Sequence, residues 1–236
     1  SQHMELYVIE TQSEVYKKGI HILNEIGEFK SSKEMFTKVY ENTTSLLKED
    51  KFLTFFGGEH SISIGIIKAF YEKFQNLSVL HIDAHADLRP SYLEDTYSHA
   101  CAMHDASKNC NLVQVGIRSM DISEEEFMNR NQVYFTEKMY GHPTWMNHSI
   151  NHLTDDVYIS LDLDAFDPSI MPSTGTPEPG GIQWNDMIQY LKLVFTSKNV
   201  VGFDIVELAP IDGLHAPNFL AAKLYYKMLS YKFCSS

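Results

Sequence analysis

Acidic and histidine side chains follow two apolar runs of this chain at every second position. The two runs are His81-Ile82-Asp83-Ala84-His85-Ala86-Asp87 and Ser160-Leu161-Asp162-Leu163-Asp164. Because alternate side chains of a β-strand point to the same face, this spacing gathers Asp83, His85 and Asp87 on one side of the first strand, and Asp162 and Asp164 on one side of the second. Unpaired, these carboxylates would repel one another, whereas two divalent cations would neutralise about four negative charges. The pattern therefore predicts a site for two metal ions.

A third stretch offers a further ligand to the same site. The residues Phe55 to Ser61 end a predicted strand with two glycines, Glu59 and His60, and a helical pattern follows. The glycines permit a tight turn that presents His60 at the edge of a sheet, and Glu59 is expected to support the turn or the helix N-terminus. Oxygen-rich ligation without cysteine favours a hard or borderline ion such as Mn²⁺, with zinc and iron as alternatives. Two adjacent ions can hold a bridging hydroxide near neutral pH, which would act as the nucleophile.

A sheet must position these residues, and apolar, β-branched runs recur along the chain as candidate strands. They cover residues 6–9, 52–56, 77–82, 112–117, 157–163 and 200–205. Helical patterns lie between them, over residues 32–47, 62–74, 184–195 and 219–231. This alternation predicts an α/β fold, a three-layer αβα sandwich with a doubly wound, mainly parallel sheet. In such folds ligands lie outside the carboxyl ends of the strands.

Composition restricts the class of protein and of partner. The 236 residues, of which 44% are apolar, suffice for one large domain, expected over residues 4–236, and residues 1–3 before Met4 are interpreted as the remnant of an expression tag. No apolar run is long enough for a membrane span, and no signal peptide is recognisable. Three cysteines without paired spacing suit a reducing compartment. We therefore expect a soluble cytoplasmic protein.

Charge argues in the same direction. The formal net charge is -12, and the 19 lysines and arginines form no run that could bind a phosphate backbone. We expect no nucleic-acid partner and no membrane partner. A small cationic molecule is compatible with this balance.

Four motifs together resemble the ureohydrolase family, which includes arginase, agmatinase and formimidoylglutamase. In the order of the chain they are Gly57-Gly58-Glu59-His60-Ser61, Asp83-Ala84-His85-Ala86-Asp87, Ser160 to Pro168 and Gly202 to Pro210. The resemblance covers residues 50–230 and is closest to agmatinase-type members. It implies an αβα hydrolase that forms homo-oligomers, either trimers or hexamers, and binds two Mn²⁺ per subunit. The implied metal ligands are His60, Asp83, His85, Asp87, Asp162 and Asp164, with Asp83 and Asp162 as bridging carboxylates.

The resemblance also implies catalytic residues. Glu207 follows the last predicted strand, where a carboxylate can pair with a planar cation through two hydrogen bonds, and it matches the family's guanidinium-binding glutamate. It would hold the guanidino carbon over the hydroxide. The expelled amine needs a proton, and His99 lies in a segment that resembles the one carrying the family's proton-shuttling histidine. His104 is close enough in sequence to compete. Asp87 joins Glu207 and His99 in the expected catalytic set.

Contacts to the rest of the substrate are less defined by the sequence. A segment ending at Asp121 resembles one that often contacts the distal end of the substrate, so Asp121 or Glu124 is expected to attract a terminal ammonium. Alternatively, Ser123 followed by Glu124, Glu125 and Glu126 is only the capped start of an acidic helix. Thr176 lies in a Gly- and Pro-rich loop and is expected to touch the guanidino group. Arg89 either forms a structural salt bridge or binds an anionic substrate tail.

The expected reaction is hydrolysis of agmatine to putrescine and urea. The segments around Arg89 and His99 resemble agmatinases more than arginases, and agmatine lacks the α-carboxylate that would require its own clamp. One alternative is a formimidoylglutamase or another guanidino-acid hydrolase. A second, a catalytically weak metal-binding member, is suggested by an N-terminal region shorter than that of relatives. A deacetylase of related fold is a weaker alternative, because such enzymes commonly use one zinc ion.

Overall fold

The structure is a computed structural model, and it describes residues 4–234. The predicted tag remnant therefore lies outside the described residues. The described chain contains one six-stranded sheet in the order β1-β6-β5-β2-β3-β4, in which all neighbours pair in parallel. The strands are β1 (Leu53–Phe56), β2 (Ser78–Ile82), β3 (Asn111–Ile117), β4 (Val133–Phe135), β5 (Asp156–Asp162) and β6 (Asn199–Val206). The prediction of an α/β fold with a mainly parallel sheet is confirmed.

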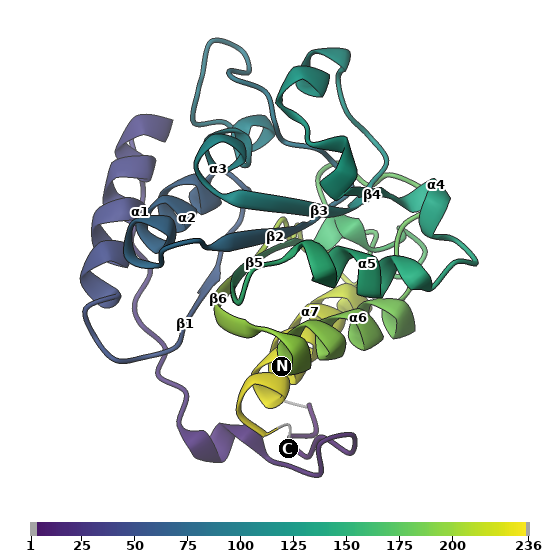
Figure 1. Cartoon of the computed structure of the whole chain (residues 1–236). Helices are drawn as coiled ribbons and strands as arrows, with labels where there is room; N and C mark the ends of the chain where they lie inside the picture. The colour runs from purple at the N-terminus through teal and green to yellow at the C-terminus, as the bar shows by residue number, and fades with distance from the viewer. Residues whose placement is uncertain (1–3, 235–236) are drawn as a thin grey trace.

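Helices cover both faces of this sheet (Figure 1). One face is covered by α2 (Ile62–Lys73) and α3 (His104–Asn109), with α1 (Ser32–Leu46) packed against α2, and the other by α5 (Thr144–His152), α6 (Trp184–Ser197) and α7 (His215–Cys234). A short α4 (Thr136–Met139) follows β4, and 3₁₀ turns cover Val15–Lys18, His99–Cys101, Ile122–Phe127, Arg130–Gln132 and Leu163–Ala165. Every residue of β2 is buried, as expected of a parallel strand covered on both faces. Among the described residues no helix is both long and apolar enough to cross a membrane.

The prediction of a strand over residues 6–9 is wrong. This segment makes only an isolated bridge between Val8 and Ser13, and it packs against α7, where the Tyr226 hydroxyl donates to the Leu6 carbonyl at 2.8 Å. Side chains of a helix thus satisfy backbone groups that a sheet would otherwise pair. Sequence analysis also missed β4, α3, α4 and α5, because a three-residue edge strand and short, polar helices carry little periodic signal.

The connections of the sheet create an edge where ligands can gather. Strands β2 and β5 are neighbours, but the chain leaves β2 towards β3 on one side and leaves β5 towards β6 on the other. Such a topological switch point opens a crevice outside the carboxyl ends of the two strands. Both acidic runs follow these strands, so the fold delivers them to the same crevice.

One carboxylate of the N-terminal segment collects three polar contacts from the helical layer. Glu10 accepts hydrogen bonds from Lys227 at 2.6 Å and Tyr231 at 2.7 Å, and Lys192 lies 3.0 Å away. Burial raises the pKa of Glu10, but these partners outweigh it and lower the pKa to about 2. Because the folded-state pKa lies below the ordinary value, the stabilisation is complete above pH 4.5 and is lost as the pH falls towards 2.

We expect Glu10→Gln to lower the free energy of unfolding at pH 7 by about 1 kcal/mol, the range of a partly exposed ion-pair network. Urea denaturation at pH 7 and at pH 3 measures this difference, which should shrink at the lower pH. Glu5→Gln, an exposed acid of the same segment, serves as the control and should change stability little at either pH. A deficit for Glu10→Gln that is equal at both pH values would contradict the assignment.

Candidate metal centre and active site

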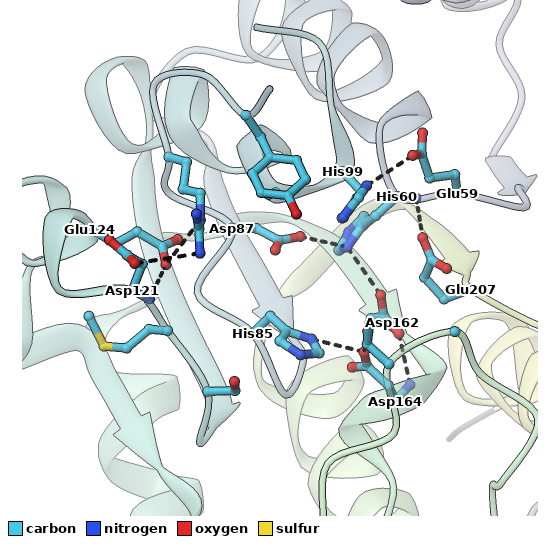
Figure 2. A pocket seen from close by; sticks show the side chains of 17 residues that line it. Glu59, His60, His85, Asp87, His99, Asp121, Glu124, Asp162, Asp164 and Glu207 are labelled. Carbon is cyan, nitrogen blue, oxygen red and sulfur yellow. Dashed lines mark hydrogen bonds and ion pairs between the residues drawn. The ribbon is translucent and has the colours of Figure 1, made fainter. Parts of the chain in front are cut away.

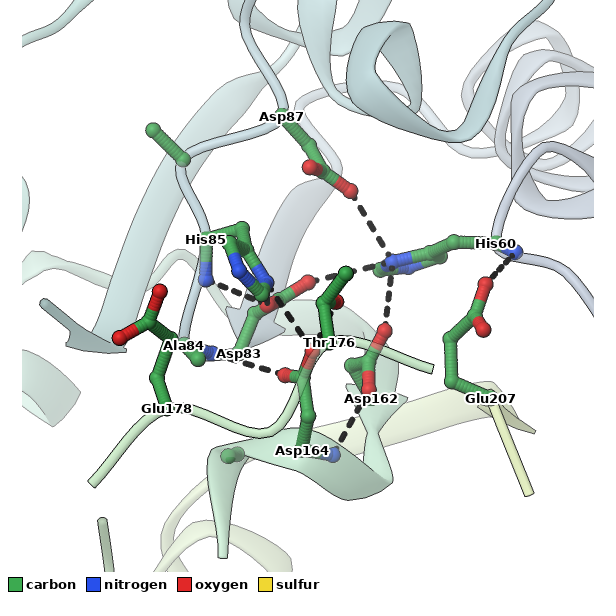
Figure 3. Close-up of polar contacts among 12 residues, drawn as sticks. His60, Asp83, Ala84, His85, Asp87, Asp162, Asp164, Thr176, Glu178 and Glu207 are labelled. Carbon is green, nitrogen blue, oxygen red and sulfur yellow. Dashed lines mark hydrogen bonds and ion pairs between the residues drawn. The ribbon is translucent and has the colours of Figure 1, made fainter. Parts of the chain in front are cut away.

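The structure brings the six residues predicted as metal ligands together at the carboxyl edge of the sheet (Figure 3). They come from three places in the fold: the turn between β1 and α2, the loop after β2, and the end of β5 with the 3₁₀ turn that follows it. In that order they are His60; Asp83, His85 and Asp87; and Asp162 and Asp164. Apart from His85, which is partly exposed, they are buried.

One half of the cluster surrounds His60. The Nδ1 atom of this buried imidazole lies 3.1 Å from Asp83 Oδ2, 3.2 Å from Asp87 Oδ2 and 3.3 Å from Asp162 Oδ2. Despite this crowding Nδ1 has no hydrogen-bond partner with acceptable geometry. A buried, unpaired nitrogen facing three carboxylate oxygens is costly unless a cation joins them. The donor set therefore fits a divalent ion.

The second half surrounds His85. Its Nδ1 atom lies 3.0 Å from Asp164 Oδ2 and 3.5 Å from Asp83 Oδ1. Asp83 thus directs one oxygen to each half of the cluster, which is the arrangement that a bridging carboxylate needs. Asp162 directs Oδ2 to the His60 half, while its Oδ1 accepts the backbone N–H of Asp164 at 2.8 Å. A bridging role for Asp162 stays a prediction.

Proton affinities in the cluster indicate how strongly it favours added positive charge. Burial raises the pKa of Asp162 well above its usual range, and the Asp164 and Asp83 carboxylates raise it further. Burial and Asp83 also raise the pKa of Asp164 to about 6. Burial lowers the pKa of His85, but Asp164 and Asp83 outweigh it and raise the pKa to about 11. Without a metal the cluster is driven to retain protons, and a divalent cation would replace them.

Two residues of the site have unusual backbone conformations. Asp87 and Glu207 both adopt positive φ angles, 52° and 65°. Residues with side chains rarely adopt this region, and surrounding contacts must hold them there. The Asp87 carbonyl accepts the N–H of Met103 at 2.9 Å, and the Glu207 N–H donates to the Gly58 carbonyl at 2.7 Å. The fold therefore imposes the direction of both carboxylates.

Sequence analysis missed His81, a fully buried neighbour of the cluster. The side-chain nitrogen of Gln114 donates to the Ala86 carbonyl at 2.8 Å and lies 3.0 Å from His81 Nδ1. Because a carbonyl can only accept, the Gln114 nitrogen is the donor in both contacts. His81 therefore carries its hydrogen on Nε2, which donates to Asp83 Oδ2 at 2.8 Å. His81 orients Asp83 and has no free lone pair for an ion. The alternation that placed Asp83 on one face also placed His81 there, and this signal could have found it.

A cavity of about 480 Å³ opens onto the cluster (Figure 2). Its lining contains seven carboxylates and a single basic side chain of the Lys or Arg type, so its electrostatic potential favours a cation. The acids are Glu59, Asp87, Asp121, Glu124, Asp162, Asp164 and Glu207, and the basic residue is Arg89. Asp83 lies fully buried beneath the cavity floor.

Glu207 and His99 both line this cavity, on the side of His60. Glu207 Oε1 accepts the backbone N–H of His60 at 2.6 Å, which ties the carboxylate to the metal-ligand turn. Burial raises the pKa of Glu207 above its usual range. His99 Nδ1 lies 2.9 Å from Glu59, an acid that also accepts a hydrogen bond from Ser61.

The competing histidine lies elsewhere. His104 Nδ1 contacts the Leu88 carbonyl at 2.8 Å, its Nε2 contacts Lys108 at 2.7 Å, and its ring packs against Phe127. It is not part of the cavity lining. Of the two candidate proton donors only His99 therefore lines the cavity, and its catalytic role stays a prediction.

The far side of the cavity differs from the expectation of a helix capped by Ser123. Asp121 is the N-cap of the 3₁₀ turn: its side chain accepts from Ser123, and Glu124 completes a capping box. Both oxygens of Glu124 accept backbone hydrogens, from Leu88 and Asp121, each at 2.7 Å, so it is occupied structurally. Arg89 lies 3.8 Å from Asp121 and 4.0 Å from Glu124, as the salt-bridge alternative predicts.

Thr176 lies on the opposite wall, where it contacts a metal-ligand candidate. Its hydroxyl is 3.5 Å from Asp164 Oδ2, and it lines the cavity. The Thr176 hydroxyl is therefore close to the metal-ligand candidates and to the cavity. A contact between Thr176 and a guanidino group stays a prediction.

Comparison with known proteins identifies the family. The model of the arginase family matches residues 3–230. The chain belongs to the arginase family. It is 33% identical over 202 residues to an N(1)-aminopropylagmatine ureohydrolase of Synechocystis sp., covering 84% of this chain and 66% of that protein. It is 32% identical over 197 residues to an agmatinase of Bacillus subtilis, covering 81% of this chain and 67% of that protein. The chain thus spans about two thirds of the length of these relatives.

Solved structures place the fold in the same family. The agmatine ureohydrolase of Thermoplasma volcanium superposes with a TM-score of 0.87 at 27% identity, over 98% of this chain and 79% of that one. This arginase-family chain is therefore an agmatinase-like member of a family of metal-dependent hydrolases that act on guanidino groups, and it carries a His/Asp cluster suited to a metal. The names of the relatives give two different substrates, so membership in the arginase family does not identify the substrate of this chain.

Proposed function

We propose that this chain is a ureohydrolase with two Mn²⁺ per subunit that cleaves agmatine to putrescine and urea. The observation that carries the proposal is the position of Glu207, a carboxylate that can pair with a guanidinium, in the lining of a cavity that five of the six cluster residues also line. The relatives are named for agmatine and aminopropylagmatine, and both of these molecules contain a guanidinobutyl group. These names support a substrate of the same chemical class.

The cluster divides into two donor sets that suit two ions. His60, Asp87 and Asp162 would hold one ion, His85 and Asp164 the other, and Asp83 would contribute to both. Oxygen-rich donor sets with one imidazole each favour Mn²⁺. The chemistry that such ions supply is Lewis acidity and the activation of water near neutral pH.

The protein's own groups bind the substrate and move its proton. Glu207 would form two parallel hydrogen bonds with the guanidinium, and its link to the His60 backbone would fix the guanidino carbon above the cluster. His99 would donate a proton to the departing amine, since the Glu59 carboxylate on Nδ1 leaves Nε2 for the cavity side. The oxygen of water would form a bond to the guanidino carbon, and cleavage of the carbon–nitrogen bond to the protonated amine would then give urea and putrescine.

Charge in the cavity selects the substrate class. A cationic guanidine without a carboxylate meets the seven acids that line the cavity. An anionic substrate tail would meet the same acids, and like-charge contacts cost several kcal/mol. Arg89 is already paired with acids, so it offers little compensation.

A substrate panel tests the proposal. Urea or ammonia release is measured with Mn²⁺-loaded protein on agmatine, N(1)-aminopropylagmatine, arginine and formimidoylglutamate. We expect the two cationic substrates to be hydrolysed, and the two substrates with carboxylates to react at least about a hundredfold more slowly, as charge repulsion of this size predicts. If the protein hydrolyses N(1)-aminopropylagmatine faster than agmatine, the aminopropyl derivative replaces agmatine as the proposed substrate. Turnover of formimidoylglutamate alone, or inactivity on the whole panel, would overturn the proposal.

Assembly and location belong to the same proposal. We propose a cytoplasmic homo-oligomer, a trimer or a hexamer, as the family resemblance implies. Light scattering coupled to size-exclusion chromatography measures the mass of the assembly, and a monomer at micromolar concentration would contradict it. Fractionation of source cells tests the location.

A further inference from the structure

A buried carboxylate outside the cavity lining is linked to the cluster through one intervening side chain. Asp204 of β6 is completely buried, and its closest backbone partner across the sheet is Ser160 of β5. Two hydroxyl groups donate to it: Tyr158 to Oδ2 and Ser160 to Oδ1, both at 2.8 Å. A buried carboxylate is costly without such donors, so both hydroxyls are committed to it.

Ser160 connects this carboxylate to His60. Its Oγ lies 2.9 Å from His60 Nε2. A serine hydroxyl has one hydrogen, and Ser160 directs that hydrogen to Asp204. The serine oxygen must therefore accept from Nε2, which means that Nε2 carries the imidazole hydrogen. The other nitrogen, Nδ1, is then left with a lone pair towards Asp83, Asp87 and Asp162.

We propose that Asp204 is a positioning residue that, through Ser160, determines which nitrogen of His60 carries the hydrogen. The inference rests on the proposed metal centre. A metal ligand must present a lone pair, and the partner of its other ring nitrogen decides whether it does so. If the hydroxyl of Ser160 pointed instead at Nε2, the hydrogen would lie on Nδ1 and would compete with the cation. The chain of Asp204, Ser160 and His60 excludes that arrangement.

Tyr158 provides a matched control, because it donates to the same carboxylate and does not contact His60. In Tyr158→Phe the serine link is intact, and we expect Mn²⁺ affinity to stay within about threefold of wild type. In the double variant Tyr158→Phe/Asp204→Asn the phenol that donated to Oδ2 is gone, and we expect the introduced amide to direct its nitrogen to the Ser160 oxygen. The serine hydrogen then turns to Nε2 and the lone pair of Nδ1 is lost. We expect Mn²⁺ affinity of one of the two sites to fall about tenfold to hundredfold relative to Tyr158→Phe.

Titration calorimetry measures both affinities, and electron paramagnetic resonance distinguishes a coupled Mn²⁺ pair from a single ion. We expect the pair signal in wild type and Tyr158→Phe, and a single-ion signal in the double variant at the same Mn²⁺ concentration. A double variant with the affinity and the pair signal of Tyr158→Phe would overturn the inference.

A second pair of variants keeps the inference testable if the double variant does not fold. Ser160→Ala removes the acceptor for the Nε2 hydrogen, whereas Ser160→Thr keeps a hydroxyl, so only the alanine variant should lose affinity. Equal Mn²⁺ affinities in these two variants would overturn the inference. If wild-type protein binds Mn²⁺ and releases urea, and all variants match it, the proposed function stands and the role of Asp204 is removed. Wild-type protein that binds no Mn²⁺ removes both.

Discussion

Asp162→Asn is expected to bind Mn²⁺ at least about a hundredfold more weakly than wild type and to lose agmatine hydrolysis with it. The Asp162 carboxylate directs Oδ2 towards His60 Nδ1 at 3.3 Å inside the cluster. The substitution keeps the shape of the side chain but removes its charge, so the ion loses an anionic ligand in a buried site. Inductively coupled plasma mass spectrometry of dialysed protein, with urea release on the same sample, measures both effects.

Metal loss and unfolding can be separated for this variant. Asp83 and Asp164 repel the buried charge of Asp162 when no cation is present. Asp162→Asn should therefore unfold, without Mn²⁺, at the wild-type temperature or above it. Added Mn²⁺ should raise the unfolding temperature of wild type more than that of the variant. Asp186→Asn removes an exposed acid of α6 and should match wild type in every measurement. If Asp162→Asn keeps wild-type metal content and turnover, the cluster is not the metal centre.

Glu207→Gln is expected to lower kcat/KM for agmatine by a factor that corresponds to roughly 2–5 kcal/mol, the cost of removing one partner of a buried charge pair. The amide oxygen of glutamine can still accept the His60 N–H, so the turn and its imidazole should keep their positions. The amide nitrogen, however, would direct hydrogens at the guanidinium donors, where two parallel hydrogen bonds are otherwise expected. Mn²⁺ content should therefore remain at the wild-type level while turnover falls.

Glu207→Asp separates charge from reach at the same position. It keeps the carboxylate but shortens the side chain, so we expect a kcat/KM between those of wild type and Glu207→Gln. The positive φ of this residue makes backbone change a concern, and an unchanged near-ultraviolet circular dichroism spectrum checks it. Steady-state kinetics at several agmatine concentrations gives kcat and KM separately. A Glu207→Gln variant with wild-type kcat/KM would remove Glu207 from substrate binding.

Much of the architecture could be predicted because the relevant signals are local. The strands β2, β3, β5 and β6 begin and end within about two residues of their predicted ranges, since each is a mainly apolar, β-branched run that one polar side chain interrupts. Elements at the margins carry weaker signals. The edge strand β4 has three residues, and the apolar run at 6–9 satisfies its backbone with the side chains of α7 instead of a sheet. Periodicity does not reveal such a long-range partner.

The candidate site divides in the same way. The order of the motifs carries the resemblance to the family. Strand alternation predicted that the acids of each run share one face, but β2 ends at Ile82, so the loop that follows it positions Asp83, His85 and Asp87, and a 3₁₀ turn positions Asp164.

Which atoms meet is a different matter. Gln114 donates a hydrogen bond to His81, and Glu59 pairs with His99, although the partners are far apart in sequence. Asp121 caps its own 3₁₀ turn. Each of these contacts depends on side-chain directions that the backbone path determines.

The sequence by itself determined the residue types, their spacing and the family, because a period of two residues and a set of ordered motifs are properties of the chain alone. Only the tertiary structure decided which carboxylates approach His60 and His85, which hydroxyl approaches His60 Nε2, and the shape of the cavity. These depend on the register between β5 and β6 and on the switch point between β2 and β5, where loops from distant parts of the chain meet at one edge.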